Sequence, residues 1–195
     1  MNFKKYLGEG LLIVFSVLFA LFINKTYEDA KTNRVKSNTI KQIKSELLDN
    51  QIILKDWIAD HNAILENLNN LIESKSDSIQ ISAENKGYLP VQIILDNKSL
   101  INKPLSNSAW SSAQSIGIIS EFDFETLQYI SITYELQQLM MDNSIENIAE
   151  RIFLKSNDIK NTKGVLIELR LRFGNLQGQE YSLENLYKET IEILD

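Results

Sequence analysis

Residues 6–23 read YLGEGLLIVFSVLFALFI, and this stretch decides how the rest of the chain is placed. From Leu11 to Ile23 every side chain is apolar except Ser16, and the one charged side chain within residues 6–23 is Glu9. At ~1.5 Å per residue a helix of this length reaches about 27 Å, which is close to the ~30 Å hydrocarbon core of a bilayer. We therefore expect residues 1–24 to form a transmembrane anchor and residues 25–195 to form one soluble domain.

Two other structures compete for the same stretch. A cleaved signal peptide would use Lys4 and Lys5 as its charged start and the apolar run as its core, but no pair of small residues follows Ala20 to mark a cleavage site. A buried helix of a soluble domain is disfavoured because the run is apolar on all sides, whereas such a helix needs a polar face. We expect a retained membrane helix.

Composition excludes several classes of function. The net charge of −6 and the absence of a basic run interleaved with aromatic residues argue against nucleic-acid binding. The chain has no cysteine and a single histidine, His61, so a thiolate nucleophile and a histidine-based metal site or triad are not expected within one chain. The seven glycines form no phosphate-binding loop. We therefore predict a protein that is not an enzyme and has no cofactor.

Residues 25–74 contain no helix breaker, and their apolar residues recur at alternating three- and four-residue steps. This spacing predicts one long amphipathic helix, continuous with the membrane helix. Further apolar residues beside the seam widen the stripe, which favours a globular bundle over a two-stranded coiled coil. The seam consists of Ile40, Ile43, Leu47, Asn50, Leu54, Trp57, His61, Ile64, Leu68 and Leu71.

The remaining residues predict an all-α domain with two further long helices and several short ones. We expect a stop at 74–77, strand-like alternation at 78–81, and short helices at 90–95 and 109–116, the second ended by Gly117. Asp123 is expected to cap a helix from 124 to about 155. A last helical region from 157 to 195 is expected to be kinked or split by its glycines, Gly174 and Gly178.

Gly8, Glu9, Gly10 and Ser16 are the candidate interaction residues of the membrane helix. The two glycines would allow another backbone to approach closely, and a carboxylate at this depth costs less free energy when it meets a hydrogen-bond donor. A proton or ion path through the membrane is the alternative role for Glu9. We prefer a packing role at the membrane interface, because Glu9 lies near the helix start, where headgroup water and the helix dipole both tolerate a carboxylate.

Trp57, His61, Trp110 and Tyr134 are the candidate core or pocket residues of the soluble domain. His61 falls on the seam, so we expect a core or interface histidine rather than a pH sensor. Trp110 stands seven residues before Gly117, which is typical of a short helix that plugs a bundle. An aromatic wall of a ligand pocket is the alternative for these side chains.

Two blocks of the chain resemble an uncharacterised family of single-span membrane proteins of Bacteroidota and other Gram-negative bacteria. The first is Gly8-Glu9, the aliphatic run, Ala20-Leu21, Ile23-Asn24 and Glu28, and the second is Ser108-Ala109-Trp110, Gly117, Leu127 and Tyr134. Thr26 stands where the family has a tryptophan. The resemblance implies an N-terminal span followed by a helical domain in the inner membrane, and the family supplies no activity to transfer.

We expect the chain to act as a non-enzymatic assembly or interaction module in the inner membrane, with the lipid bilayer and either its own copies or another membrane protein as partners. The alternative is an extracytoplasmic small-molecule sensor domain that signals through a membrane partner. The basic residues after the span, from Lys25 to Lys36, favour a cytoplasmic body, whereas the basic N-termini of the family imply a periplasmic one. We prefer the periplasmic side.

Overall fold

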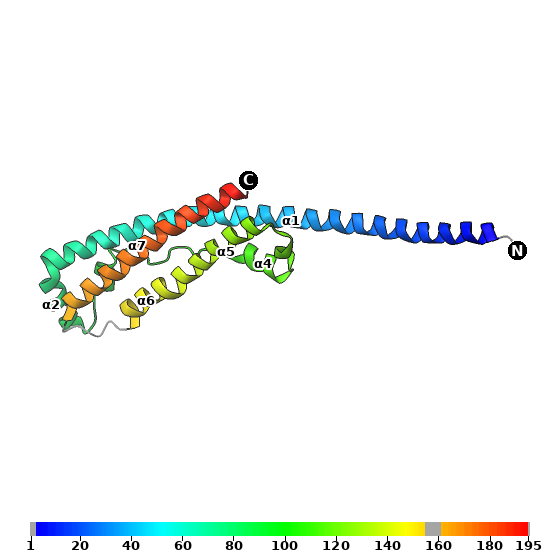
Figure 1. Ribbon diagram of the computed structural model, residues 1–195. Helices are drawn as coiled ribbons and strands as arrows, with labels where there is room; N and C mark the ends of the chain where they lie inside the picture. Colours follow the sequence, from blue (N-terminus) through cyan, green and yellow to red (C-terminus); the bar gives the residue numbers. More distant parts are fainter. Residues whose placement is uncertain (1–2, 155–160, 195) are drawn as a thin grey trace.

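A computed structural model describes residues 3–154 and 161–194 of the chain, and this part is helical with no β-strand. The first helix, α1, runs from Phe3 to Asn70 as one uninterrupted element (Figure 1). It therefore crosses the expected boundary between residues 24 and 25 without a break, so the apolar run and the body of the molecule share one continuous helix. The all-α fold class is confirmed.

The N-terminal half of α1 projects from the body of the molecule with no other helix beside it (Figure 1). In the described part of the chain, α1 is the one helix long and apolar enough to cross a bilayer, and none of its most apolar window is buried. Val35 is the first residue of α1 that packs against the core. At ~1.5 Å per residue, a polar helical stalk of about 18 Å separates Ile23 from Val35.

Short elements follow α1 and lead into two further long helical stretches. They are η1 (Leu71–Lys75, a π-helical turn), α2 (Ser76–Lys86), α3 (Val91–Ile94), α4 (Ser108–Ser115), the 3-10 turn η2 (Ile118–Glu121) and α5 (Phe124–Leu139). α5 continues through η3 (Met140–Ile145, π-helical), α6 (Glu146–Ala149) and η4 (Glu150–Leu154, π-helical), and the last helix is α7 (Thr162–Ile193).

Local sequence explains where several of these helices begin and end. Asp123 caps α5, because its carboxylate accepts a hydrogen bond of 2.9 Å from the backbone N–H of Thr126. Asn161 caps α7 in the same way through the N–H of Gly164. Gly117 follows α4 with φ of +73°, a left-handed conformation that favours glycine. The expected short helices at 90–95 and 109–116 and the cap at Asp123 are thus confirmed.

Three expectations about the elements are wrong. Residues 74–77 do not stop the helix, because η1 continues into α2, and the alternation at 78–81 lies within α2 rather than in a strand. There, Ile79 and Ala83 form a helical i, i+4 pair in the core, while Ile81 is exposed. Gly174 and Gly178 do not split α7, since packing along its whole length outweighs the low helix propensity of glycine. The expected start at 157 lies outside the described residues.

The three long helical stretches pack side by side with alternating directions. α7 is antiparallel to α1, because His61 meets Glu180 while Ile40 and Leu194 line one groove nearer the stalk. The stretch α5–η3 is also antiparallel to α7, since Thr133 meets Thr190 and Ser144 meets Gln179. The C-terminus therefore lies close to the point where α1 leaves the bundle (Figure 1). Residues 87–123 carry the chain back from the far end of α1 to the start of α5.

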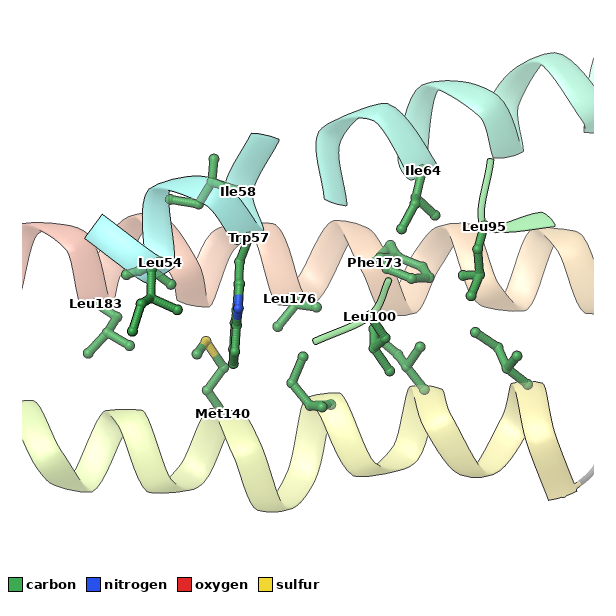
Figure 2. Close-up of a cluster of buried hydrophobic side chains, with 14 of the residues drawn as sticks. Leu54, Trp57, Ile58, Ile64, Leu95, Leu100, Met140, Phe173, Leu176 and Leu183 are labelled. Carbon is green, nitrogen blue, oxygen red and sulfur yellow. The ribbon is translucent and has the colours of Figure 1, made fainter. Parts of the chain in front are cut away.

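The core is built from the seam of α1. Every seam residue is buried except Ile40, which is half-buried against the core. In Figure 2 the indole of Trp57 extends from α1 toward Met140 of η3, beside Leu176 of α7. Helical stripes of apolar residues predict eight buried side chains, and the structure buries all of them except Leu127, which is half-buried: Leu47, Leu54, Trp57, Leu68, Leu127, Tyr134, Ile148 and Phe173.

Candidate functional site

One face of α1 carries a row of hydrogen-bonding side chains that contact the returning segment 93–109. We call this row the polar ladder, and it consists of Asn67, His61, Trp57, Asn50 and Glu46. Each member bonds to a backbone atom of the returning segment, and the segment runs antiparallel to α1. The contacts are to the carbonyls of Ile93, Ile94, Leu100, Lys103 and Ser106 and to the N–H groups of Ser106 and Ala109.

The ladder explains why polar residues interrupt an otherwise apolar seam. Between α3 and α4 the returning segment has no regular secondary structure, so its backbone groups need partners from elsewhere. A buried amide or carbonyl without a partner costs about 1–3 kcal/mol. Side chains of α1 supply those partners, and the ladder therefore fixes the position of residues 93–109 along α1.

Asn50, which is itself fully buried, is the centre of a polar cluster between α1, the returning segment and α5. Its amide oxygen accepts from the N–H of Ser106 at 2.8 Å, and its amide nitrogen donates to the carbonyl of Ser106 at 2.7 Å. The same nitrogen donates to the side chain of Gln137 at 3.2 Å, which also accepts the hydroxyl of Tyr187 at 2.7 Å. Burial raises the pKa of the Tyr187 hydroxyl, so this group stays protonated and acts as a donor.

Glu46 lies one turn closer to the stalk, and three hydrogen-bond donors hold its carboxylate in place. Oε1 accepts the hydroxyl of Tyr134 at 2.6 Å, while Oε2 accepts the hydroxyl of Ser106 at 2.5 Å and the N–H of Ala109 at 3.0 Å. The last contact satisfies a free N–H in the first turn of α4, which its N-cap Asn107 leaves without a side-chain bond. Burial, and then the bond to Glu46, raise the pKa of Tyr134, so it too remains a donor.

His61 forms a buried pair with Glu180 in the middle of the bundle. Its Nε2 lies 2.9 Å from the carbonyl of Leu100, which can only accept, so Nε2 carries a hydrogen. Its Nδ1 lies 2.6 Å from Oε1 of Glu180, and two bare acceptors would repel at that distance, so this pair shares a proton. Within the described part of the chain, the other oxygen of Glu180 is the one buried side-chain N or O atom that lacks a hydrogen-bond partner.

The four candidate core or pocket residues lie in two separate ring clusters. The imidazole of His61 lies between the indole of Trp57, at 6.2 Å, and the ring of Phe173, at 5.6 Å in edge contact. Trp110 stacks on Tyr134 with centroids 5.8 Å apart and planes 6° apart. The four candidate core or pocket residues thus form two pairs, one beside Glu180 and one beside Glu46. All four side chains are buried.

A groove of about 420 Å³ opens beside the stalk-proximal end of the ladder. Its lining includes Glu46 and Asn50 from the ladder, together with side chains of α1 and of residues 103–109. Trp110 and Tyr134 do not line it, although Tyr134 holds the carboxylate that does. The groove therefore combines polar side chains with a larger share of apolar surface, and the aromatic pair does not line it.

The candidate residues of the membrane helix lie far from this site. Gly8, Glu9, Gly10 and Ser16 are all exposed. The hydroxyl of Ser16 donates to the carbonyl of Leu12 in its own helix at 2.8 Å, so this hydroxyl is satisfied without a partner chain. The role of these residues in helix packing stays a prediction.

Sequence reasoning missed several residues that build the site. Glu46 is not among the seam residues, yet its carboxylate bonds to Tyr134 and to the start of α4, and Glu180 was not singled out at all. The available signal was its helical spacing from apolar residues, since Glu180 lies four residues after Leu176, three before Leu183 and seven before Tyr187. Its pairing with His61 could not be read from spacing, because the two residues lie on different helices.

Chemistry beyond hydrogen bonding finds little support at these positions. Among the residues that the structure describes, no group of three or more His, Cys, Asp or Glu side chains could hold a metal ion. Comparison with protein-family models, with curated proteins and with solved structures gave no match. The resemblance of the two sequence blocks to the Bacteroidota membrane family stays a prediction.

Proposed function

We propose that this chain is a non-enzymatic, membrane-anchored module that assembles in the inner membrane with its own copies or with another membrane protein. The observation that carries the proposal is the exposed N-terminal half of α1. Every residue from Gly8 to Lys31 is exposed, although the run from Leu11 to Ile23 is strongly apolar. The bundle completes its own core without this run, so a bilayer and neighbouring membrane helices are the surroundings that suit it.

The rigid link between the two parts supports the same proposal. α1 passes from the apolar run through the stalk into the bundle without a break. A contact between two membrane helices would therefore fix the spacing and orientation of the attached bundles. Assembly in the membrane and presentation of the soluble domain would be set by a single element.

Oligomer size in detergent tests the proposal. We expect the full chain to run as a defined oligomer or to copurify with a stoichiometric membrane protein, and Gly8→Leu with Gly10→Leu to reduce that assembly. Ala20→Leu is the matched control, because it adds the same kind of side chain at a different depth of the helix. A monodisperse monomer with no copurifying chain would contradict the proposal.

The preferred side for the bundle is the periplasm. The chain has no cysteine, so a single Ser111→Cys variant, at an exposed position of α4, provides a unique label site. We expect a membrane-impermeant maleimide to label this cysteine in spheroplasts without lysis. Labelling only after lysis would place the bundle in the cytoplasm.

An extracytoplasmic small-molecule sensor is the second candidate function, and the groove beside Glu46 favours it. The groove is lined by α1, which continues without interruption into the apolar run. A ligand in the groove could therefore alter the helix that reaches the membrane partner. Ligand-dependent change in the copurifying assembly would support this function, and an assembly insensitive to any bound ligand would remove it.

A further inference from the structure

The carboxylate of Glu46 forms no salt bridge with any side chain of residues 3–154 and 161–194. Its three hydrogen bonds come from neutral donors, namely two hydroxyls and one backbone N–H. A carboxylate offers about four acceptor sites, so one site remains, on the oxygen that Tyr134 already contacts.

The groove around Glu46 has the lining of a small-ligand site. Its lining includes Gln42, Ser45 and Asp49 of α1 together with Glu46, and Lys103 and Ser108 of the returning segment. Asp49 takes part in no ion pair or side-chain hydrogen bond with the rest of the described chain, nor does the side chain of Lys103. With Glu46 and Asp49 negative and Lys103 positive, the lining has a net charge of −1.

The geometry points to a soluble molecule rather than a lipid headgroup as the occupant. Glu46 lies 23 residues beyond Ile23, which at ~1.5 Å per residue is about 35 Å from the end of the apolar run. This distance exceeds the thickness of a headgroup layer, which is roughly 5–8 Å on each side of the hydrocarbon core. The volume of about 420 Å³ falls within the ordinary range for small-ligand pockets.

We propose that this groove binds a small soluble molecule that carries a primary ammonium group. The ammonium group donates to the free acceptor site of Glu46 and to Asp49, and the polar remainder of the molecule meets Gln42, Ser45 and Ser108. Tyr134, Ser106 and Ala109 hold the Glu46 carboxylate in a fixed orientation, so binding does not have to order it. This proposal rests on the sensor function and specifies the class of ligand that the sensor would bind. It does not depend on the assembly function.

Titration of the full chain in detergent with 1,4-diaminobutane tests the proposal. The readouts are calorimetry and the backbone amide NMR signals of Ser106 and Ala109. We expect saturable binding at low salt and a shift of the Ala109 amide signal, because a cation beside the carboxylate that this N–H contacts changes the electric field at the amide. Glu46→Gln should weaken binding by roughly tenfold or more, as expected for a hydrogen bond to a charged group. 1,4-Butanediol, the neutral analogue, should not bind.

Two further variants keep the test decisive if Glu46→Gln disturbs the fold. Asp49→Asn changes an exposed side chain of the groove and should weaken binding severalfold. Asp56→Asn removes the same charge from an exposed position of α1 outside the groove and should leave binding unchanged. No saturable diamine binding, equal binding of the diol, or equal losses in Asp49→Asn and Asp56→Asn would overturn the proposal. If binding occurs without any change in the assembly, the groove is a ligand site and the sensor function fails.

Discussion

His61 of α1 and Glu180 of α7 meet in the middle of the bundle, with Nδ1 and Oε1 2.6 Å apart and both side chains almost fully buried. The pair joins the helix that continues into the apolar run to the helix that ends beside the stalk. The Nε2–H of the same imidazole holds the carbonyl of Leu100, so three segments meet at one ring. An ion or polar group in such a place is costly alone and tolerable only with its partner.

Loss of both members of this pair should destabilise the bundle by less than the sum of the two single losses. We expect Glu180→Leu or His61→Leu alone to lower the free energy of unfolding by about 3–5 kcal/mol, because each leaves a buried polar group without its partner. The double variant should lose less than the sum of the two. Urea unfolding followed by circular dichroism measures all three. Strict additivity would show that the two side chains do not interact.

The core assignment predicts a sharp contrast between two neighbouring residues of α1. Leu54 is fully buried, whereas Ile52 is 62% exposed. Leu54→Ala should lower the free energy of unfolding by roughly 2–5 kcal/mol, because it removes buried apolar surface and leaves a cavity. Ile52→Ala should change it by at most ~0.5 kcal/mol. Similar losses for the two variants would place Ile52 in an interface of the assembled protein.

Two glycines of α7 should be replaceable with a gain in stability. A Cβ added at Gly174 or Gly178 meets nothing within 4 Å, and both residues lie inside a helix. Each Gly→Ala change should raise the free energy of unfolding by about 0.4–1 kcal/mol, because it reduces the freedom of the unfolded chain. Gly117→Ala is the contrasting control and should destabilise, since φ there is +73°. Destabilisation at 174 or 178 would reveal a contact that the single chain does not contain.

The cap of α5 predicts a pH-dependent contribution to stability. The hydrogen bond from the backbone N–H of Thr126 lowers the pKa of Asp123 below its ordinary value. The contribution is therefore present above the pKa of the unfolded chain, about 3.9, and is lost as pH falls through the lower folded value. Thermal unfolding at pH 7 and in acid should show that the deficit of Asp123→Ala relative to the native chain shrinks in acid. Asparagine is a neutral cap, so the stability of the Asp123→Asn variant should lack the part of the pH dependence that Asp123 contributes.

The sequence allowed the helical architecture to be predicted because its signals are local. The step pattern from Ile40 to Leu71 placed the core face of α1, and Asp123 and Gly117 marked real helix ends. Local signals failed at residues 78–81, where alternation over four residues competes with a helix that the core contacts of Ile79 and Ala83 stabilise. They also failed at Gly174 and Gly178, where packing on α1 and α5 overrides propensity.

The candidate site could be predicted only in part, since its contacts join segments distant in sequence. Trp57, His61, Trp110 and Tyr134 stood out by residue type, and each is buried. Their partners did not stand out: Glu46 bonds to Tyr134 across 88 positions, and His61 to Glu180 across 119. No periodicity relates such pairs. The path of the returning segment 93–109 could not be predicted either, because side chains of α1 rather than a local sequence pattern hold it in place.

A cysteine scan of the membrane helix tests the central claim, that the apolar run anchors the chain and brings copies together. The face centred on Glu9 includes Leu12, Ile13 and Ser16, and the opposite face includes Leu11, Val14 and Leu18. With single cysteines placed in the otherwise cysteine-free chain, oxidation of native membranes should cross-link positions 12, 13 and 16 strongly and positions 11, 14 and 18 weakly. Gly8→Leu with Gly10→Leu should suppress that pattern. A flat profile, or recovery of the chain in the soluble fraction, would contradict the account.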